Sequence, residues 1–308
     1  MRHTLYCALC LIATVALGLL SMRYLTRLWV LTFFTSAQTH IALFGMTLAA
    51  LAFLLRRHWY PALLFVAAGA LAIHSLLILR EHAAPAAAET AASFRLLSFN
   101  IDNENRKDPA HIADAILGSQ ADVVAIYEAV TLLPEMDRLA KAYPYRIGCG
   151  VMSQDCDSLV MSKRPFLTAE MRDLGMIWRN RLIVSAVDIG GKPVTFVSAH
   201  LSKPYFDAFH RDELVVLRNV FRDIDGAAIL SGDFNASVLP PDMRAFLTRS
   251  GLQHASSEPA TWPIAAGDFG IAIDHIFVRP PVEIVAVRRL PDSLGSNHYG
   301  LIADFGLR

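Results

Sequence analysis

Side chains that could bind a metal ion and a phosphate follow several apolar runs in the later part of the chain. They are Asn100, Glu128, His200, the run 232–235 (Gly-Asp-Phe-Asn), Asp274 with His275, and the run 296–298 (Ser-Asn-His). Mg²⁺ prefers hard oxygen ligands, and Glu128, Asp233 and Asp274 offer carboxylates. The histidines are then available to donate hydrogen bonds to phosphoryl oxygens. This set predicts metal-assisted hydrolysis of a phosphate ester or anhydride.

Motifs of several other mechanisms are absent from the sequence. The chain has no GxxxxGK[ST] phosphate loop, no GxSxG nucleophile elbow and no HExxH zinc motif. Kinase-like and serine-hydrolase mechanisms therefore lack the residues they need, and zinc ligation is not favoured. The formal net charge is +0, so no broad basic field attracts a phosphate backbone and a nucleic-acid partner is not favoured.

The polar residues stand at the ends of apolar runs that are typical of strands. Predicted strands cover 94–101, 121–128, 158–162, 181–189, 193–200, 227–234, 271–278, 282–289 and 301–305, and predicted helices cover 110–117, 132–142, 206–224 and 242–250. Gly190-Gly191 between two strands predicts an antiparallel hairpin. Mixed strands that alternate with helices favour an α/β sandwich of two packed sheets. Polar strand ends would then meet in a crevice at one edge.

The first part of the chain has the composition of a membrane anchor. Three stretches, near 5–20, 37–55 and 60–79, carry no charged residue and predict about three transmembrane helices in residues 1–80. A cleaved signal peptide and buried helices of a soluble core are the alternatives. The alanine-rich segment 81–93 is interpreted as a linker, and 94–308 as one catalytic domain.

Cys149 and Cys156 are the only cysteines of the predicted catalytic domain. A pair separated by such a short loop could close a disulfide in an oxidising compartment. We therefore expect a multi-pass protein of the cell membrane with its catalytic domain on the extracytoplasmic side. Two free thiols remain the alternative, and the positive charges that flank the apolar stretches do not decide the orientation.

In chain order the polar motifs resemble the endonuclease/exonuclease/phosphatase superfamily. The resemblance rests on 97–101 (Leu-Ser-Phe-Asn-Ile), Glu128, 198–201 (Ser-Ala-His-Leu), 232–236 (Gly-Asp-Phe-Asn-Ala), 273–277 (Ile-Asp-His-Ile-Phe) and 296–298. It covers 94–308, and 232–236 is its most specific motif. Together with the anchor it is similar to the membrane-bound bacterial branch that includes VanJ-like proteins. The resemblance implies a four-layer αββα sandwich and metal-assisted attack of water on phosphorus.

The same resemblance implies a role for each matching residue. Glu128 would be the main ligand of Mg²⁺, with Asn100 beside it and Mn²⁺ as an alternative ion. Asp233 would orient or deprotonate the attacking water. The remaining implied roles are phosphate binding by Asn235, transition-state stabilisation by His200 and His298, and fixation of the His298 tautomer by Asp274.

Two further residues are included in the predicted site. Asn297 stands where the family usually has aspartate, so we expect a weaker or single metal site, with Asn297 ligating through its amide oxygen. Arg211, on the predicted helix after His200, is a candidate substrate-binding residue, although a surface salt bridge is an equal alternative. The run 178–181 (Trp-Arg-Asn-Arg) could contact phosphate or anionic lipid, but solvated charge is the favoured interpretation there.

The leading functional hypothesis is a membrane-anchored hydrolase of a phosphomonoester, phosphodiester or pyrophosphate. A lipid-linked substrate fits the anchor, because a tether near the bilayer raises the effective concentration of lipid phosphates. A tethered nuclease is one alternative. A non-catalytic membrane protein that binds a phosphorylated ligand or a partner is the other, and Asn297 is its only support.

Overall fold

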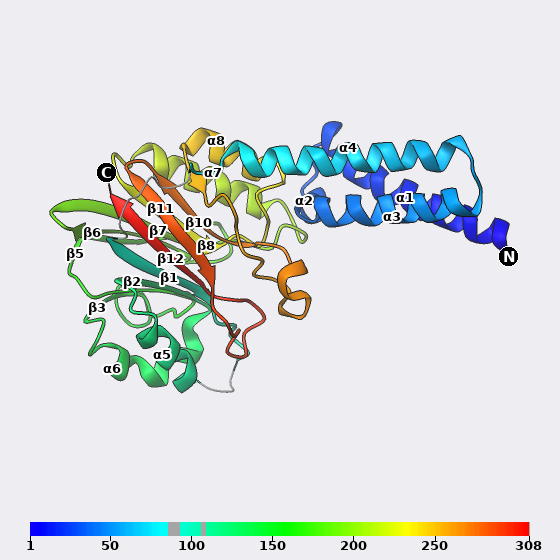
Figure 1. Cartoon of the computed structure of the whole chain (residues 1–308). Helices are drawn as coiled ribbons and strands as arrows, with labels where there is room; N and C mark the ends of the chain where they lie inside the picture. The colour runs from blue at the N-terminus through cyan, green and yellow to red at the C-terminus, as the bar shows by residue number, and fades with distance from the viewer. Residues whose placement is uncertain (86–92, 106–108, 308) are drawn as a thin grey trace. The chain divides into compact units, whose positions relative to one another are not determined.

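The computed structural model describes residues 1–85, 93–105 and 109–307. The chain divides into two compact units (Figure 1). The first, called the helical unit below, comprises Met1–Glu81 with Pro204–Ala208 and Ala236–Ala245. The second, called the sandwich unit, comprises His82–Lys203, Phe209–Asn235 and Phe246–Arg308.

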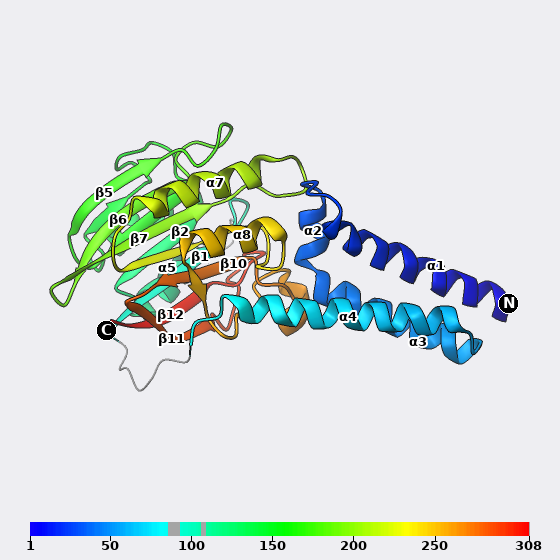
Figure 2. The same cartoon turned by 90° about the horizontal axis from the view of Figure 1, so that it is seen from above.

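Long apolar helices build the helical unit. They are α1 (Arg2–Ser21), α3 (Gln38–Leu55) and α4 (Trp59–Glu81), with the short η1 (Met22–Tyr24) and α2 (Leu31–Ser36) between α1 and α3. Figure 2 shows α3 and α4 lying side by side. Ala42 and Ala68 are fully buried, whereas Leu11 and Leu54 are exposed. Small residues therefore let the helices approach closely, and large apolar side chains face outward as in a bilayer.

The spans predicted from the sequence agree with the helices of the structure. Arg2–Tyr24, Gln38–Leu55 and Trp59–Glu81 are long and apolar enough to cross a membrane. The structure adds the short helix α2, which the hydropathy of the sequence does not single out. Within this unit the Ser237 hydroxyl donates to the Ser36 carbonyl at 3.0 Å. The segment Ala236–Ala245 is thus bound directly to the apolar helices.

Two mixed six-stranded sheets form the sandwich unit. The first has the order β11 (Val282–Arg289), β12 (Leu301–Leu307), β1 (Phe94–Asn100), β2 (Val123–Tyr127), β4 (Ser158–Ser162), β3 (Tyr145–Ile147). The second has the order β5 (Phe166–Arg172), β6 (Leu182–Ile189), β7 (Lys192–His200), β8 (Ala228–Asp233), β10 (Asp274–Arg279), β9 (Gln253–His254). The pairs β1–β2 and β7–β8 are parallel, and every other neighbouring pair among the described strands is antiparallel.

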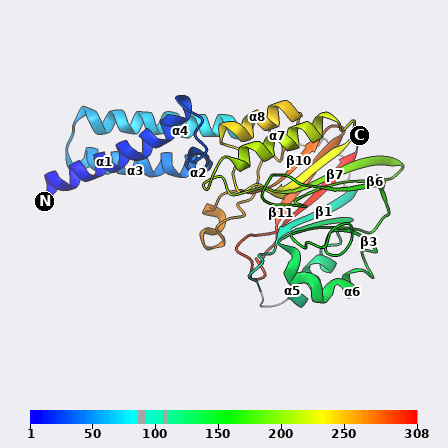
Figure 3. The same ribbon diagram turned by 180° about the vertical axis from the view of Figure 1, so that it is seen from behind.

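The main hydrophobic core lies between the two sheets. Phe94 and Tyr127 of the first sheet and Phe196 and Ile229 of the second belong to one buried cluster. A second cluster packs the outer face of the first sheet against α5 (Pro109–Gly118), the 3-10 helix η2 (Ala129–Glu135) and α6 (Met136–Leu139). The helix α7 (Phe209–Arg222) and the end of α8 (Pro241–Ser250) lie on the outer face of the second sheet (Figures 1 and 3). This arrangement confirms the predicted four-layer αββα sandwich.

A few elements differ from the sequence predictions. The strand β5 was not predicted because most of its side chains are exposed, so no apolar run marks it. The strands β3 and β9 span only three and two residues, too few to show a period. The helix predicted over 132–142 is instead a 3-10 helix followed by the short α6. Pro134 lies inside the 3-10 segment and has no N–H to donate to an α-helical ladder.

Two other predictions concern connecting segments. The Gly190-Gly191 hairpin is confirmed, since β6 and β7 pair antiparallel up to Ile189 and Lys192. Both glycines have positive φ, which a residue with a side chain rarely adopts. Of the predicted linker 81–93, residues 86–92 lie outside the described part, and Ala83 forms a bridge with His254.

Candidate active site

The strand topology brings the predicted polar residues to one edge of the sandwich. The parallel strands β1, β2, β7 and β8 end at or just before Asn100, Glu128, His200 and Asp233. The antiparallel neighbours start at the same edge, because Asp274 is in register with Asp233 and Ser158 with Tyr127. His298 precedes β12 in the same way. Residues that are far apart in sequence therefore meet because their strands share one end.

Asn100, Glu128 and Asp233 form the centre of the cluster. The Asn100 amide donates to Oε1 of Glu128 at 3.1 Å and to Oδ2 of Asp233 at 2.9 Å. Asn100 and Asp233 are each 1% exposed, whereas the Glu128 side chain is 22% exposed. Two carboxylates are thus held side by side with one amide between them. This is an oxygen-rich arrangement of the type that a hard divalent cation binds.

Two imidazoles approach these carboxylates from opposite sheets. Nε2 of His200 lies 3.9 Å from Glu128 Oε1 and 3.8 Å from Asp233 Oδ2. Nε2 of His298 lies 3.8 Å from the same Asp233 oxygen. Both Nε2 atoms therefore point toward one carboxylate, at separations longer than a direct hydrogen bond.

Each imidazole is oriented from behind by a carboxylate. Nδ1 of His298 donates to Asp274 Oδ2 at 2.8 Å, and Nδ1 of His200 donates to Asp157 Oδ2 at 2.9 Å. Burial alone would lower the pKa of His298, but the charges of Asp274 and Asp233 outweigh it and raise the pKa to about 9. In metal-free protein His298 is therefore an imidazolium at neutral pH. His200 and Asp157 form a second pair in which a carboxylate accepts from Nδ1 of the imidazole.

Asp157 was not identified from the sequence. Burial raises the pKa of its carboxyl, but the hydrogen bond and charge of His200, with Arg181, hold the pKa below its usual value. Its second oxygen accepts from Arg181 Nη2 at 2.8 Å. The available signal was its position directly before the strand 158–162, beside the predicted Cys149–Cys156 pair. That position indicates a site residue only once β4 is known to run antiparallel to β2, because β4 then begins at the edge where β2 ends.

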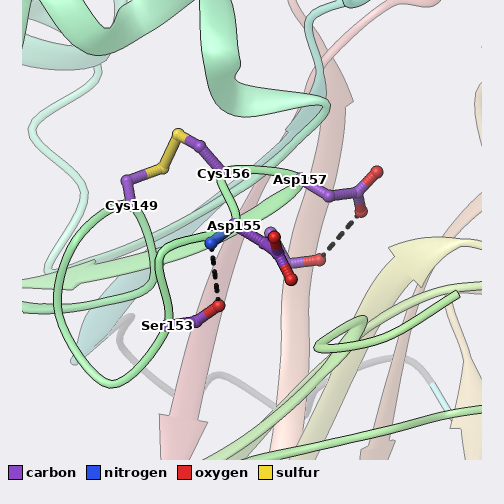
Figure 4. Close-up of a disulfide and its surroundings, with 6 residues drawn as sticks. Cys149, Ser153, Asp155, Cys156 and Asp157 are labelled. Atoms are coloured by element: carbon purple, nitrogen blue, oxygen red, sulfur yellow. Dashed lines mark hydrogen bonds between the residues drawn. A yellow bond between two sulfur atoms is a disulfide. The ribbon is translucent and has the colours of Figure 1, made fainter.

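The disulfide between Cys149 and Cys156 is formed, as predicted. It closes the loop between β3 and β4 immediately before Asp157 (Figure 4). Inside the loop the Ser153 hydroxyl accepts from the Asp155 N–H at 3.0 Å, and the Asp155 carbonyl accepts from the Cys149 N–H at 3.2 Å. The backbone that carries Asp157 into the site is therefore fastened covalently and by hydrogen bonds.

Backbone constraints explain two of the sequence motifs. A Cβ at Gly232 would lie 2.1 Å from the Ala199 carbonyl oxygen, so only glycine lets β8 pass β7 at this point. The Ser296 hydroxyl donates to the Asn100 carbonyl at 2.7 Å and accepts from the His298 N–H at 3.0 Å. Ser296 thereby ties the last loop to the end of β1.

Three predicted residues lie outside the centre of the cluster. The Asn235 amide donates to the Leu201 carbonyl at 2.9 Å, at the border of the cluster. The Asn297 side chain is exposed and makes no hydrogen bond to the cluster within the described part of the chain. The Arg211 side chain is 48% exposed and its ion pair is with Asp212 at 3.9 Å. The structure does not bring Asn297 or Arg211 to the centre.

The helix that carries Arg211 contributes other residues instead. Nε2 of His210 donates to the Phe234 carbonyl at 2.9 Å, and burial lowers the pKa of this imidazole to about 4. The Glu213 carboxylate accepts from the Ser202 N–H at 2.7 Å and from its hydroxyl at 2.6 Å. Burial raises the pKa of Glu213. The buried face of α7 thus fixes the chain just after β7 and β8.

The donor set fits a divalent cation at two overlapping places. Ligand atoms of Asp233, Asp274 and His298 all lie within 4.8 Å of one another, but His298 would ligate a metal ion only in its neutral form. Glu128, a predicted ligand, offers carboxylate oxygens beside Asp233. Asn100, the other predicted ligand, turns its amide N–H₂ toward both carboxylates, and its Oδ1 accepts from the Asp102 N–H at 3.0 Å. Carboxylate and amide oxygens suit Mg²⁺ or Mn²⁺.

Comparison with protein families places the chain in the endonuclease/exonuclease/phosphatase family, whose model matches residues 97–298. The chain belongs to this family of enzymes, which act on phosphate esters. None of the curated proteins compared with the sequence matches it.

Solved structures share the fold at low sequence identity. A humanised D. rerio TDP2 is 19% identical with a TM-score of 0.57, over 69% of this chain and 98% of the other. The catalytic domain of human Nocturnin with bound sulfate is 20% identical with a TM-score of 0.52, over 71% and 96%. Sphingomyelinase C from Streptomyces griseocarneus is 18% identical with a TM-score of 0.51, over 70% and 99%. At such identities the likeness shows the fold alone.

Proposed function

We propose that this protein is a membrane-anchored, divalent-metal-dependent phosphoesterase. The observation that carries the proposal is the convergence of two oriented imidazoles on a carboxylate centre. His200 and His298 both direct Nε2 toward Asp233, which also shares the Asn100 amide with Glu128. These groups can supply the base and the hydrogen-bond donors that assist hydrolysis of a phosphomonoester, phosphodiester or pyrophosphate.

Glu128 would hold the cation beside Asp233. Asn100 would ligate it through Oδ1 only after a turn of the amide, because this oxygen accepts from the Asp102 N–H. A bound Mg²⁺ or Mn²⁺ would neutralise negative charge that develops on the phosphoryl oxygens. The side chain of Glu128 is the most exposed of the three, so it can reach an ion that also keeps water ligands. Asn297 would join only if its exposed amide turned inward.

The protein groups around this position have distinct tasks. The Asp233 carboxylate would orient the attacking water and accept its proton, because its Oδ1 is held by the Asn235 N–H at 2.8 Å. His298, protonated beside Asp274, would donate to a phosphoryl oxygen through Nε2. His200, held by Asp157, would donate to a second oxygen. The Asn235 amide would contact a third.

The helical unit supports a membrane location. Three of its helices are long and apolar enough to span a bilayer, and the Cys149–Cys156 disulfide favours an oxidising compartment. We therefore propose that the sandwich unit lies on the extracytoplasmic side of a cell membrane. A lipid-linked phosphate is a substrate that such a tether favours.

The test is Mg²⁺-dependent turnover by the full-length protein reconstituted in lipid nanodiscs. Substrates are alkyl phosphate monoesters, alkyl methyl phosphate diesters, inorganic pyrophosphate and single-stranded DNA. Glu128→Gln should reduce kcat about a hundredfold or more. Glu104→Gln, an exposed acid of the loop after β1, is the matched control. Hydrolysis of DNA alone would replace this proposal with a nuclease, and no Glu128-dependent turnover on any substrate would reject it.

A further inference from the structure

The run 178–181, singled out in the sequence, forms one wall of a cavity beside the candidate active site. The cavity has a volume of about 560 Å³ and is lined on this side by Ile177, Trp178, Arg179 and Arg181. These residues belong to the loop between β5 and β6. The solvated-charge interpretation of this run is incomplete, because the run borders an open cavity.

The opposite walls of the cavity reach the catalytic cluster. Asn103 lines the cavity, and its backbone N–H donates to Glu128 Oε2 at 2.9 Å. Asp157 lines it as well and holds His200. A group attached to a phosphate at the cluster can therefore extend into this cavity.

The wall formed by the loop is fixed by polar contacts to the disulfide loop. Nδ2 of Asn180 donates to Asp155 Oδ2 at 2.7 Å, and Arg181 Nη2 donates to Asp157 Oδ1 at 2.8 Å. The Arg181 guanidinium also lies 4.5 Å from the centroid of the Trp178 ring, a cation–π distance. Trp178 is thus held in place before any ligand arrives, which lowers the entropic cost of binding.

Three exposed apolar side chains contribute to a lining that also contains polar and charged residues. Ile177 is 54% exposed, Trp178 50% and Val130 44%, and all three line the cavity. Neighbouring exposed apolar side chains of this kind mark binding sites. The charges are balanced, because Asp155 and Asp157 face Arg179 and Arg181. This balance disfavours a polyanion such as DNA.

Arg179 is the one cation of the wall that remains available to a ligand. Arg181 is paired with Asp157, whereas no partner contacts Arg179 within residues 1–85, 93–105 and 109–307. Its charge can attract the phosphate of the substrate whatever the size of the attached group.

We propose that this cavity binds the leaving group of the substrate, and that this group is an alkyl chain. Ile177, Trp178 and Val130 select the chain by apolar contact, and Arg179 attracts the phosphate. The inference rests on the proposed phosphoesterase function and adds the residues that bind the leaving group. The exposed aliphatic side chains of Ile177 and Val130 and a single aromatic ring, one side of which faces Arg181, fit a hydrocarbon better than a nucleobase, which needs a free ring face for stacking.

The test measures how kcat/KM depends on chain length. Full-length protein in nanodiscs hydrolyses n-alkyl phosphate monoesters and n-alkyl methyl phosphate diesters from ethyl to octyl, below their aggregation concentrations. For the wild type we expect kcat/KM to rise about two- to fourfold per methylene. Trp178→Ala and Ile177→Ala should at least halve the slope of the logarithm, while the ethyl ester changes less than about twofold. Trp178→Phe should restore most of the slope.

Two controls separate this cavity from general effects. Leu167→Ala removes a comparable side chain, 55% exposed, at the far end of β5 from the loop, and should keep the wild-type slope. Arg179→Gln should lower kcat/KM by a similar factor for all chain lengths, without a change in slope.

The outcomes distinguish this inference from the proposed function. Glu128-dependent turnover with equal slopes in wild type and Trp178→Ala would overturn the leaving-group site and leave the phosphoesterase intact. A nucleoside 5′-methyl phosphate hydrolysed faster than the octyl ester, with loss of that preference in Trp178→Ala, would overturn the alkyl assignment. Absence of Glu128-dependent turnover on every ester rejects the proposed function itself.

Discussion

The carboxylate of Asp157 accepts a hydrogen bond from Nδ1 of His200 at 2.9 Å, so the ring presents Nε2 to the candidate active site. The two residues come from different sheets, since Asp157 precedes β4 and His200 ends β7. One hydrogen bond thus joins the two layers of the sandwich at the site. It also fixes the orientation of the His200 ring.

The first prediction tests this bond. Asp157→Asn keeps the shape of the side chain but removes its charge, and the amide can turn its N–H₂ toward the ring. We expect kcat to fall about a hundredfold, with a smaller change in KM, because a misoriented donor acts mainly in the transition state. The assay measures hydrolysis of the ethyl phosphate esters described above. Asp155→Asn, which loses its contact to Asn180 but none to His200, should keep kcat within about threefold; equal kcat in both variants would contradict the role of Asp157.

The second prediction concerns the metal. A cation that binds only the folded protein stabilises it by about 2.7 kcal/mol at a hundred times its Kd. Addition of Mg²⁺ or Mn²⁺ to chelator-treated protein should therefore raise the Tm. Glu128→Gln should remove most of this increase, and Glu104→Gln should not. Differential scanning fluorimetry in detergent gives the measurement, and an unchanged increase in Glu128→Gln would exclude Glu128 as the main ligand.

The third prediction follows from the pKa of His298 in metal-free protein. This pKa is raised from 6.5 to about 9, so the folded protein holds a proton that the unfolded chain releases. The resulting stability is fully present below about pH 6.5 and is lost as the pH rises through 9. The Tm of wild type in chelator should fall across this window, and His298→Gln should flatten the fall. A wild-type Tm that is constant from pH 6.5 to 9.5 would contradict the raised pKa.

The fourth prediction concerns the disulfide beside Asp157. Cys149→Ser or Cys156→Ser should lower stability by about 2 kcal/mol, the order expected for such a short loop. It should also lower kcat about tenfold, because the backbone before Asp157 is no longer fastened. Reduction of the wild type with a dithiol should give the same kcat. Cys7→Ser, a free cysteine of α1, is the control, and full activity of Cys156→Ser would show that hydrogen bonds alone hold Asp157.

Much of the site could be predicted because apolar runs in the sequence show where the strands end. Asn100, Glu128, His200 and Asp233 each follow an apolar run, and the parallel pairs β1–β2 and β7–β8 place those ends together. Strand β5 could not be predicted, since an edge strand with exposed side chains lacks the buried face that produces a pattern. Its existence depends on pairing with β6.

The sequence alone could not predict in which direction individual side chains point. Ser296 and His298 are buried while Asn297 between them is exposed, so a motif of neighbours sends its members to opposite sides. On α7 the buried face carries His210 and Glu213 and leaves Arg211 outside, as the helical period requires. A spacing identifies the helix, but only packing decides which face is buried.

The position of β12 has a consequence for the order in which the first sheet and the candidate active site assemble during synthesis. β12 lies between β11 and β1, and Arg95 pairs with Asp304, 209 residues further along the chain. During synthesis β1 lacks this neighbour until β12 has left the ribosome, and such distant contacts form slowly. Ser296 and His298 arrive with the same segment. A chain truncated before Ser296 therefore lacks both β12, the neighbour of β1 and β11, and one of the two imidazoles of the candidate active site.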